Sequence, residues 1–210
     1  MDRIDKKMLL VILQKIAEKI IAEKELLTRL DTAIGDGDHG INMARGFEAV
    51  LAEMESVAEG DMGAVLKNTG MKLVSTVGGA SGPLYGTAFM KAGKAAKGKM
   101  EMSLADMLQA FSAAIEGIKM RGKSEPGEKT MLDALCPAYE AMAEEKQDFV
   151  QAFKAAAAAA EKGAEHTKNI IATKGRASYL GERSLGHVDP GAMSATLILK
   201  VMAETLETAE

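Results

Sequence analysis

Apolar residues recur at helical spacing along almost the whole chain. In residues 2–24 they fall three or four positions apart and so share one face of a helix: Ile4, Met8, Val11, Ile12, Ile16 and Ile20. A shorter helix carries Leu26, Leu27 and Leu30 and ends near Gly35. The same spacing predicts helices over about 41–56, 61–77, 83–97, 103–120, 130–142, 148–172 and 191–206.

Local signals support several of these helices. Ser103 followed by Asp106 is typical of a capping box at a helix start, and Pro83 is placed in a first helical turn, where proline is favoured. Six consecutive alanines, residues 155–160, favour close packing of helices. No stretch alternates with the period of a strand, and no linker divides the chain. We therefore expect an all-α fold in which residues 1–210 form a single domain, an up-and-down bundle of about eight helices.

Composition narrows the class of protein. The chain is mildly acidic, with a net charge of −4, whereas nucleic-acid binding needs a basic face. No nucleic-acid partner is therefore expected. Cys136 stands alone in an apolar run, which predicts a buried small hydrophobe and no intrachain disulfide. The apolar run 8–13 is too short for a membrane span or a signal peptide, so we expect a cytoplasmic protein that does not bind membranes.

Four segments interrupt the helical pattern: residues 34–40, 78–82, 121–129 and 173–190. All are rich in glycine and polar residues. The helices between them run back and forth, so these loops can gather at the same end of a bundle. Binding and catalytic residues are most often carried by such loops on a rigid scaffold.

The segment from Asp31 to Gly40 carries the strongest chemical signal. It holds aspartates at positions 31, 36 and 38, with glycines at 35, 37 and 40 among them. Clustered carboxylates repel one another unless a cation compensates them, and glycine lets a ligand approach the backbone closely. The segment therefore predicts a loop around a divalent cation, with a solvated acidic turn as the alternative.

The spacing in this segment does not fit an EF-hand. Counting from Asp36, the twelfth position is Phe47, where a calcium loop needs a bidentate glutamate. Counting from Asp31, the third position is Ala33 instead of a ligand. Magnesium is usually bound by few protein carboxylates together with phosphate oxygens, so we expect magnesium here.

Two further segments could bind phosphate. The glycine-rich run 78–83 enters a helix, and the N–H groups and dipole of a helix N-terminus favour an anion. Near the end of the chain, Lys174, Arg176 and Arg183 offer cations within a long stretch of low periodicity. A tight turn and a solvated basic loop are the respective alternatives.

A third segment, residues 117–124, matches the letters of a P-loop. That motif requires a strand before it and a helix after it, whereas here a helix precedes and Pro126 disfavours helical geometry at Glu125. We therefore discount it. Of the histidines, His39 is a candidate ligand, phosphate contact or acid–base group, with loop orientation as the alternative. We expect His166 to be exposed and His187 to stabilise the last loop.

These motifs, in this order, resemble the DhaL family, the nucleotide-binding subunit of dihydroxyacetone kinase. The resemblance covers essentially the whole chain and rests on these segments: Leu30-Asp31, Ile34 to Asn42, Leu66 to Met71, Gly78 to Leu84, Arg121-Gly122-Lys123, Pro126-Gly127, Lys129-Thr130-Met131, and the long 174–191 loop. It implies a helical barrel with a nucleotide bound at one end.

The resemblance also implies which residues bind the metal ions and which bind the nucleotide. Asp31, Asp36 and Asp38 would hold two Mg²⁺ ions that bridge the phosphates of ADP, which alternates with ATP. The nucleotide itself would be bound by His39, Gly40, Ile41, Asn42, Ala80, Ser81, Gly122, Met131, Arg176, Asp189, Pro190 and Gly191. No protein nucleophile is expected, because phosphoryl transfer depends on positioning and charge neutralisation; Arg176 is a possible charge stabiliser.

The resemblance leaves open which subunits are the partners of the chain and which molecule donates the phosphoryl group. We favour a subunit whose bound ADP is rephosphorylated by a phosphohistidine phosphocarrier subunit of the phosphotransferase system and then phosphorylates dihydroxyacetone held on a separate kinase subunit. The length of the chain agrees with a separate subunit, and a homodimer is possible. The alternatives are an ATP-exchanging kinase subunit for a small ketose, a fatty-acid kinase module, and, from another class, a helical interaction module with a structural metal.

Overall fold

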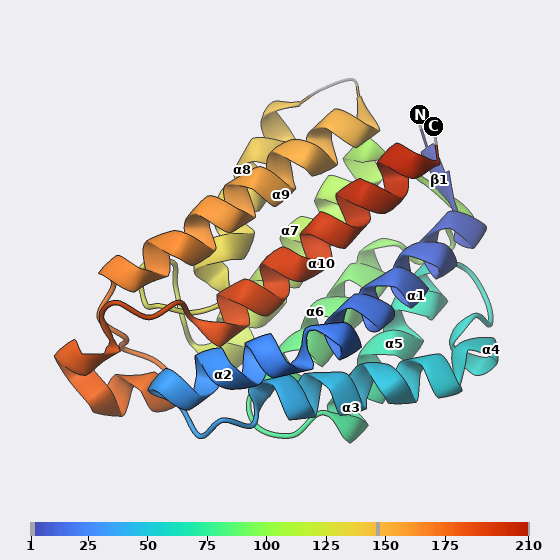
Figure 1. The fold of residues 1–210 in the computed structure, drawn as a ribbon. Helices are drawn as coiled ribbons and strands as arrows, with labels where there is room; N and C mark the ends of the chain where they lie inside the picture. The colour runs from blue at the N-terminus through green and yellow to red at the C-terminus, as the bar shows by residue number, and fades with distance from the viewer. Residues whose placement is uncertain (1–2, 146–147, 210) are drawn as a thin grey trace.

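The computed structural model describes residues 3–145 and 148–209, and these are almost entirely helical (Figure 1). The α-helices are α1 Lys6–Ala22, α2 Lys24–Ile34, α3 His39–Ala52, α4 Met54–Val57, α5 Met62–Thr76, α6 Ser81–Ala95, α7 Leu104–Gly122, α8 Leu132–Glu144, α9 Phe149–His166 and α10 Pro190–Thr208. Two 3-10 helices, η1 Thr167–Asn169 and η2 Arg176–Ser184, lie between α9 and α10.

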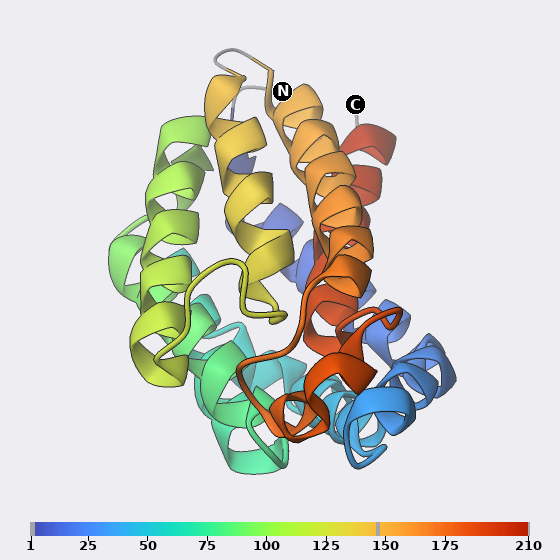
Figure 2. The ribbon, with the colours of Figure 1, turned by 90° about the vertical axis from the view of Figure 1, so that its left-hand side faces the viewer.

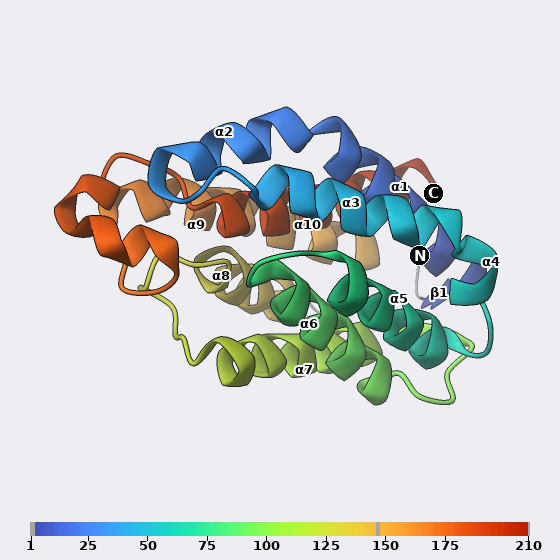
Figure 3. The same cartoon turned by 90° about the horizontal axis from the view of Figure 1, so that it is seen from below.

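The long helices form a closed ring. Each packs against its neighbours in the order α1, α3, α5, α6, α7, α8, α9, α10, and α10 returns to α1 (Figures 1 and 3). Helix α2 continues the direction of α1 and covers the start of α3. Successive helices of the ring run in alternating directions. The predicted all-α, up-and-down architecture is therefore confirmed.

Several predicted boundaries were wrong. The first predicted helix, 2–24, begins in fact at Lys6, and its first position lies outside the described residues. Helix α3 begins at His39 instead of 41, and α6 begins at Ser81, which moves Pro83 to the third helical position. The helix predicted over 148–172 ends at His166, and the helix predicted over 41–56 is divided into α3, which ends at Ala52, and the short helix α4.

Two short strands were also not predicted. β1, Arg3–Asp5, pairs antiparallel with β2, Glu101–Ser103, at the end of the ring where α1 begins and α10 ends. Three residues are too few for alternation to be recognised in a sequence. Both strands lead into helix caps: Asp5 accepts the backbone N–H of Met8, and Ser103 and Asp106 form the predicted capping box of α7.

Helices α5 and α6 approach each other at glycines. A Cβ added to Gly70 would lie 2.6 Å from the carbonyl oxygen of Gly86, and one added to Gly86 would lie 2.8 Å from that of Gly70. A side chain at either position would push the helices apart. This close antiparallel pair places the turn between them, residues 77–80, at the opposite end of the ring from the strands.

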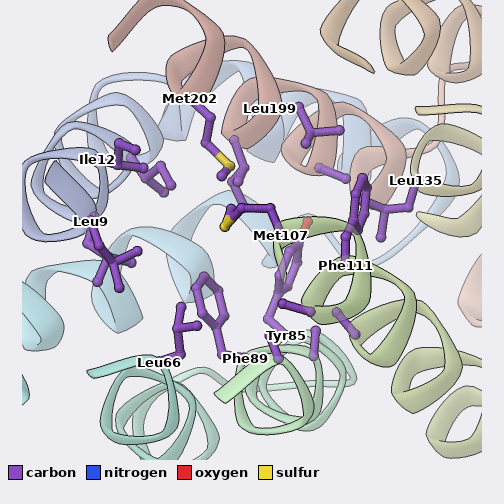
Figure 4. A pocket seen from close by; sticks show the side chains of 18 of the residues that line it. Leu9, Ile12, Leu66, Tyr85, Phe89, Met107, Phe111, Leu135, Leu199 and Met202 are labelled. Atoms are coloured by element: carbon purple, nitrogen blue, oxygen red, sulfur yellow. The ribbon is translucent and has the colours of Figure 1, made fainter. Parts of the chain in front are cut away.

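The interior of the ring is apolar and incompletely filled. A cavity of about 150 Å³ is lined by aliphatic, methionine and aromatic side chains of several helices, among them Leu9, Ile12, Leu66, Phe89, Met107, Phe111 and Met202 (Figure 4). Tyr85 also borders this cavity, and its hydroxyl bonds to Ser194 of α10 at 2.7 Å. Tyr85 therefore separates the apolar interior from the polar end of the ring.

Two sequence expectations concern smaller features. Cys136 is only partly buried, contrary to the prediction of a buried residue; burial still raises the pKa of its thiol to about 11, which makes it a poor nucleophile at neutral pH. His166 is exposed, as predicted. Within residues 3–145 and 148–209, no helix combines the length and the apolar character that a membrane span requires.

Candidate functional site

The interrupting loops gather at one end of the ring, which faces the viewer in Figure 2. They enclose a pocket of about 460 Å³ between the ends of α2 and α7, the starts of α3, α6 and α10, and the segments around 129–131 and 174–177. The predicted site residues that line it are Asp31, Asp36, Asp38, His39, Ala80, Ser81, Gly122, Met131, Arg176, Asp189, Pro190 and Gly191. Residues from distant parts of the chain thus share one concave surface.

Three carboxylates converge on one side of this pocket. Oxygen atoms of Asp31, Asp36 and Asp38 lie within 4.8 Å of one another. Asp31 is buried in the last turn of α2, and its Oδ2 accepts the backbone N–H groups of Asp38 at 2.8 Å and His39 at 3.0 Å. These bonds hold the loop in place, and the cluster keeps several carboxylate oxygens that can act as metal ligands. Such a donor set fits Mg²⁺, which binds through few carboxylates together with phosphate oxygens.

Arg176 forms an ion pair with this cluster. Its Nε is 2.8 Å from Oδ2 of Asp36, and its side chain is 68% exposed. An exposed ion pair of this kind contributes roughly 0–1 kcal/mol, so little opposes its exchange for another partner. The arrangement places a guanidinium at the mouth of the pocket, where it can contact an anion.

His39 forms the centre of a buried polar network. Its Nδ1 is 2.9 Å from the hydroxyl of Ser81, and its Nε2 is 3.0 Å from the hydroxyl of Ser194. Burial lowers the pKa of His39, although the carboxylates of Asp31 and Asp38 oppose that shift. The imidazole, bonded on both sides, joins the acidic loop to the starts of α6 and α10, which supports an orienting role for His39.

The start of α6 contributes backbone donors. Gly79, at φ +63°, turns the chain so that Ala80 and Ser81 enter the helix beside the acidic loop. The N-cap residue Ala80 makes no side-chain hydrogen bond to these first N–H groups, which leaves them available to an anion in the pocket.

The opposite wall is built from two segments that touch. A Cβ added to Gly191 would lie 3.5 Å from Cβ of Met131, which shows how closely the start of α10 approaches residue 131. Asp189 caps α10 by accepting the N–H of Ala192 at 2.7 Å. Burial raises the pKa of Asp189 to about 7. The N–H groups at the start of α10 and the charge of Lys129 act in the opposite direction and lower this pKa.

Three residues that the resemblance placed at the nucleotide lie behind the pocket surface. Gly40 packs against α2, since a Cβ there would be 2.1 Å from the carbonyl oxygen of Lys24. Ile41 is exposed on α3. The side chain of Asn42 accepts a bond from Arg45 at 2.7 Å. Gly40 and Asn42 are placed to support the loop from behind.

Lys129 is a residue of the pocket that the sequence did not indicate. Lys129 is 1% exposed, borders the pocket, and has a left-handed backbone at φ +61°. It belongs to the Lys129-Thr130-Met131 segment that carried part of the resemblance, but no local pattern distinguishes it from the exposed lysines of the chain. Its burial depends on segments that lie 38 and 58 residues away in the chain.

The P-loop interpretation has no structural support. Residues 117–122 are the last turns of α7, and Lys123 is exposed in a left-handed conformation where the helix ends. We expect Lys123→Ala to change the affinity for Mg²⁺·ADP by less than threefold, as measured by calorimetric titration. Loss of binding in this variant would revive the P-loop interpretation.

Comparison with known proteins identifies the class. Residues 33–204 match the DAK2 domain, and the chain is 46% identical over 184 residues to the ADP-binding subunit DhaL of the PEP-dependent dihydroxyacetone kinase of Escherichia coli, covering 86% of this chain and 88% of that one. The PTS-dependent DhaL of Lactococcus lactis is 41% identical over 92% of this chain and 94% of its own.

A solved structure is similar in fold. The dihydroxyacetone kinase of C. freundii in complex with AMP-PNP and Mg²⁺ superposes with a TM-score of 0.74 at 26% identity, over 93% of this chain and 33% of that chain. The chain therefore belongs to the DAK2 domain family, and within it to the DhaL family of phosphotransferase subunits.

Proposed function

We propose that this chain, acting as one domain over residues 1–210, binds ADP with two Mg²⁺ ions and transfers phosphoryl groups to dihydroxyacetone. The observation that carries the proposal is the convergence of three carboxylates with the open N-terminus of α6 in one pocket. A metal alone would need only the carboxylates, whereas a metal–phosphate complex uses both. The names of the DhaL relatives support ADP as the nucleotide.

Each part of the site has a distinct task in this proposal. Asp31, Asp36 and Asp38 hold the cations, which supply charge neutralisation to the phosphates when bound. Ser81 and the first N–H groups of α6 bind phosphate oxygens, and Arg176 leaves Asp36 to contact the transferred group. The wall formed by Gly122, Met131 and 189–191 holds the rest of the nucleotide.

The reaction uses no protein nucleophile. A phosphoryl group would pass from the phosphohistidine of a phosphocarrier subunit to bound ADP, and the freed histidine would take up a proton. The same group would then pass to a hydroxyl oxygen of dihydroxyacetone on a separate kinase subunit, where a base of that subunit would take the hydroxyl proton and ADP would be left. Both steps depend on positioning and charge compensation. We place this cycle in the cytoplasm, where both partners would dock at the open end of the ring; a homodimer is compatible with it.

A second candidate is an ATP-exchanging kinase subunit. It is supported by the AMP-PNP complex of the similar structure and by 34% identity to the human triokinase/FMN cyclase over 96% of this chain and 36% of that protein. In this case ATP would enter and ADP would leave in each cycle.

Transfer of a labelled phosphoryl group distinguishes the two candidates. The chain is loaded with ADP and Mg²⁺, freed of excess nucleotide, and mixed with phosphocarrier bearing ³²P on its histidine. We expect the label to appear on the protein-bound nucleotide, with slow exchange against free ATP. Rapid exchange with free ATP and no transfer from the carrier would contradict the coenzyme proposal.

Thermal melting separates a nucleotide site from a structural metal site. We expect Mg²⁺ alone to change the melting temperature little, and Mg²⁺ with ADP at about 100 times its dissociation constant to raise it by roughly 5–10 °C. The reason is that the phosphates complete the coordination of the metal. A full shift with Mg²⁺ alone would favour the helical interaction module.

A further inference from the structure

Lys129 is a buried cation in the wall of the nucleotide pocket. Among the residues that the structure describes, no other lysine or arginine side chain is buried to this extent. Burying an ammonium group is costly unless it is paired and hydrogen-bonded, and apolar residues of similar size generally stabilise a protein as well or better. The left-handed backbone at this residue adds a further conformational cost. Two unfavourable features at one position beside a pocket call for an explanation.

The ammonium group ties three segments together. Nζ donates to the carbonyl oxygen of Thr167, just after α9, and to that of His187, just before α10, both at 2.5 Å. The hydroxyl of Thr167 in turn accepts the N–H of Asp189 at 2.9 Å. Lys129 therefore bonds directly to the segment that leads into the Asp189–Gly191 wall.

The backbone around Lys129 is held independently. The carboxylate of Asp133 accepts the N–H of Gly127 at 2.5 Å and that of Thr130 at 2.7 Å. The residues on either side of Lys129 are thus fixed to α8, and its side chain extends from this fixed base. Movement of His187 away from Lys129 would break a bond made by Nζ, and movement of Asp189 away from Thr167 would break the bond between its N–H and the Thr167 hydroxyl.

Charge favours the same arrangement. The carboxylates of Asp189 and Asp133 both act on Lys129 and oppose the effect of burial, which lowers its pKa. The cation in turn lowers the pKa of Asp189, whose carboxylate caps α10. A neutral side chain of the same size would leave two carbonyl groups without this donor and Asp189 without a nearby cation.

We propose that Lys129 is a positioning residue for nucleotide binding. Its ammonium group fixes the 187–191 segment against Met131 and so sets the spacing of the two segments that form this wall of the pocket. This inference rests on the proposed nucleotide site. It goes beyond that site by assigning the geometry of the wall to one buried charge that lies outside the metal and phosphate residues.

Chemical replacement of the side chain tests the proposal. In a Cys136→Ser background, Lys129→Cys provides one thiol. This thiol is alkylated in the unfolded protein, which is then refolded. Aminoethylation restores a side chain of the length of lysine with its ammonium group. Propylation gives a side chain of the same length without charge. Cys136→Ser protein taken through the same steps is the control, and Lys123→Cys in that background is the matched variant at an exposed lysine.

We expect the propylated protein to bind Mg²⁺·ADP at least tenfold more weakly than the control and the aminoethylated protein to bind within threefold of it. The affinity of the three aspartates for Mn²⁺ without nucleotide, measured by electron paramagnetic resonance, should stay within twofold in both. All affinities are measured where circular dichroism shows full helical content. Lys123→Cys should be insensitive to either reagent.

Three results would overturn the inference: equal ADP affinity of the two alkylated proteins, failure of aminoethylation to restore binding, or a parallel loss of Mn²⁺ and ADP affinity. The last would indicate general destabilisation. Failure of the proposed function is distinguishable, because the Cys136→Ser control itself would then not bind ADP.

Discussion

Asp38→Asn is expected to lower the affinity for Mg²⁺·ADP by at least a hundredfold while the helical fold remains intact. Asp38 contributes one of the three carboxylates whose oxygens lie within 4.8 Å of one another. Removing it takes away a metal ligand and the charge that holds the cations against the phosphates. Asp36→Asn should act in the same direction and also release Arg176 from its ion pair.

The same variant has an opposite effect on the metal-free protein. Because like charges at short distance repel, loss of one carboxylate should leave the metal-free protein equally stable or more stable by up to about 1 kcal/mol. Calorimetric titration measures the affinity, and urea denaturation measures the stability. Glu182→Gln, an exposed carboxylate on η2, is the matched control and should change neither quantity. Unchanged ADP affinity in Asp38→Asn and Asp36→Asn would move the metal site elsewhere.

Gly40→Ala is expected to cause the largest loss of stability among single-methyl additions at the site. The new Cβ would lie 2.1 Å from the carbonyl oxygen of Lys24 and 2.6 Å from the backbone nitrogen of Thr28. Both are backbone atoms, so relief requires α3 to move away from α2. Overpacking of this kind costs about 3 kcal/mol, which corresponds to a decrease in melting temperature of roughly 6–12 °C.

This movement would also affect binding. It would separate Asp31 of α2 from the N–H groups of Asp38 and His39 that it accepts, so ADP affinity should fall as well. Ile41→Ala, at the exposed neighbouring position, is the control and should change stability by no more than about 0.5 kcal/mol. A Gly40→Ala protein with the melting temperature of the unsubstituted chain would contradict the observed packing of α2 and α3.

The helical architecture was predictable because apolar periodicity is a local property. Ile12, Ile16 and Ile20 are all buried, as their spacing indicates, and the capping box at Ser103 is present. Boundaries were less accurate where local signals compete. His39 and Gly40 were assigned to a loop because of the surrounding aspartates and glycines, yet they form the first turn of α3.

The site was predictable to the extent that its chemistry is contiguous in sequence. The three aspartates lie within eight positions, and their side chains do meet. Lys129 could not be recognised in this way, since its role depends on the carbonyl groups of Thr167 and His187, far along the chain. The same holds for the network from His39 to Ser194, which links residues 155 positions apart.

The retained coenzyme is the central claim of this account, and the nucleotide that the protein carries when purified tests it most directly. The chain is purified without added nucleotide, denatured, and the released small molecules are identified by chromatography and mass spectrometry. We predict ADP in near-stoichiometric amount. Protein that releases no nucleotide, and that then binds and exchanges ATP with Mg²⁺, would contradict the claim and favour the ATP-dependent alternative.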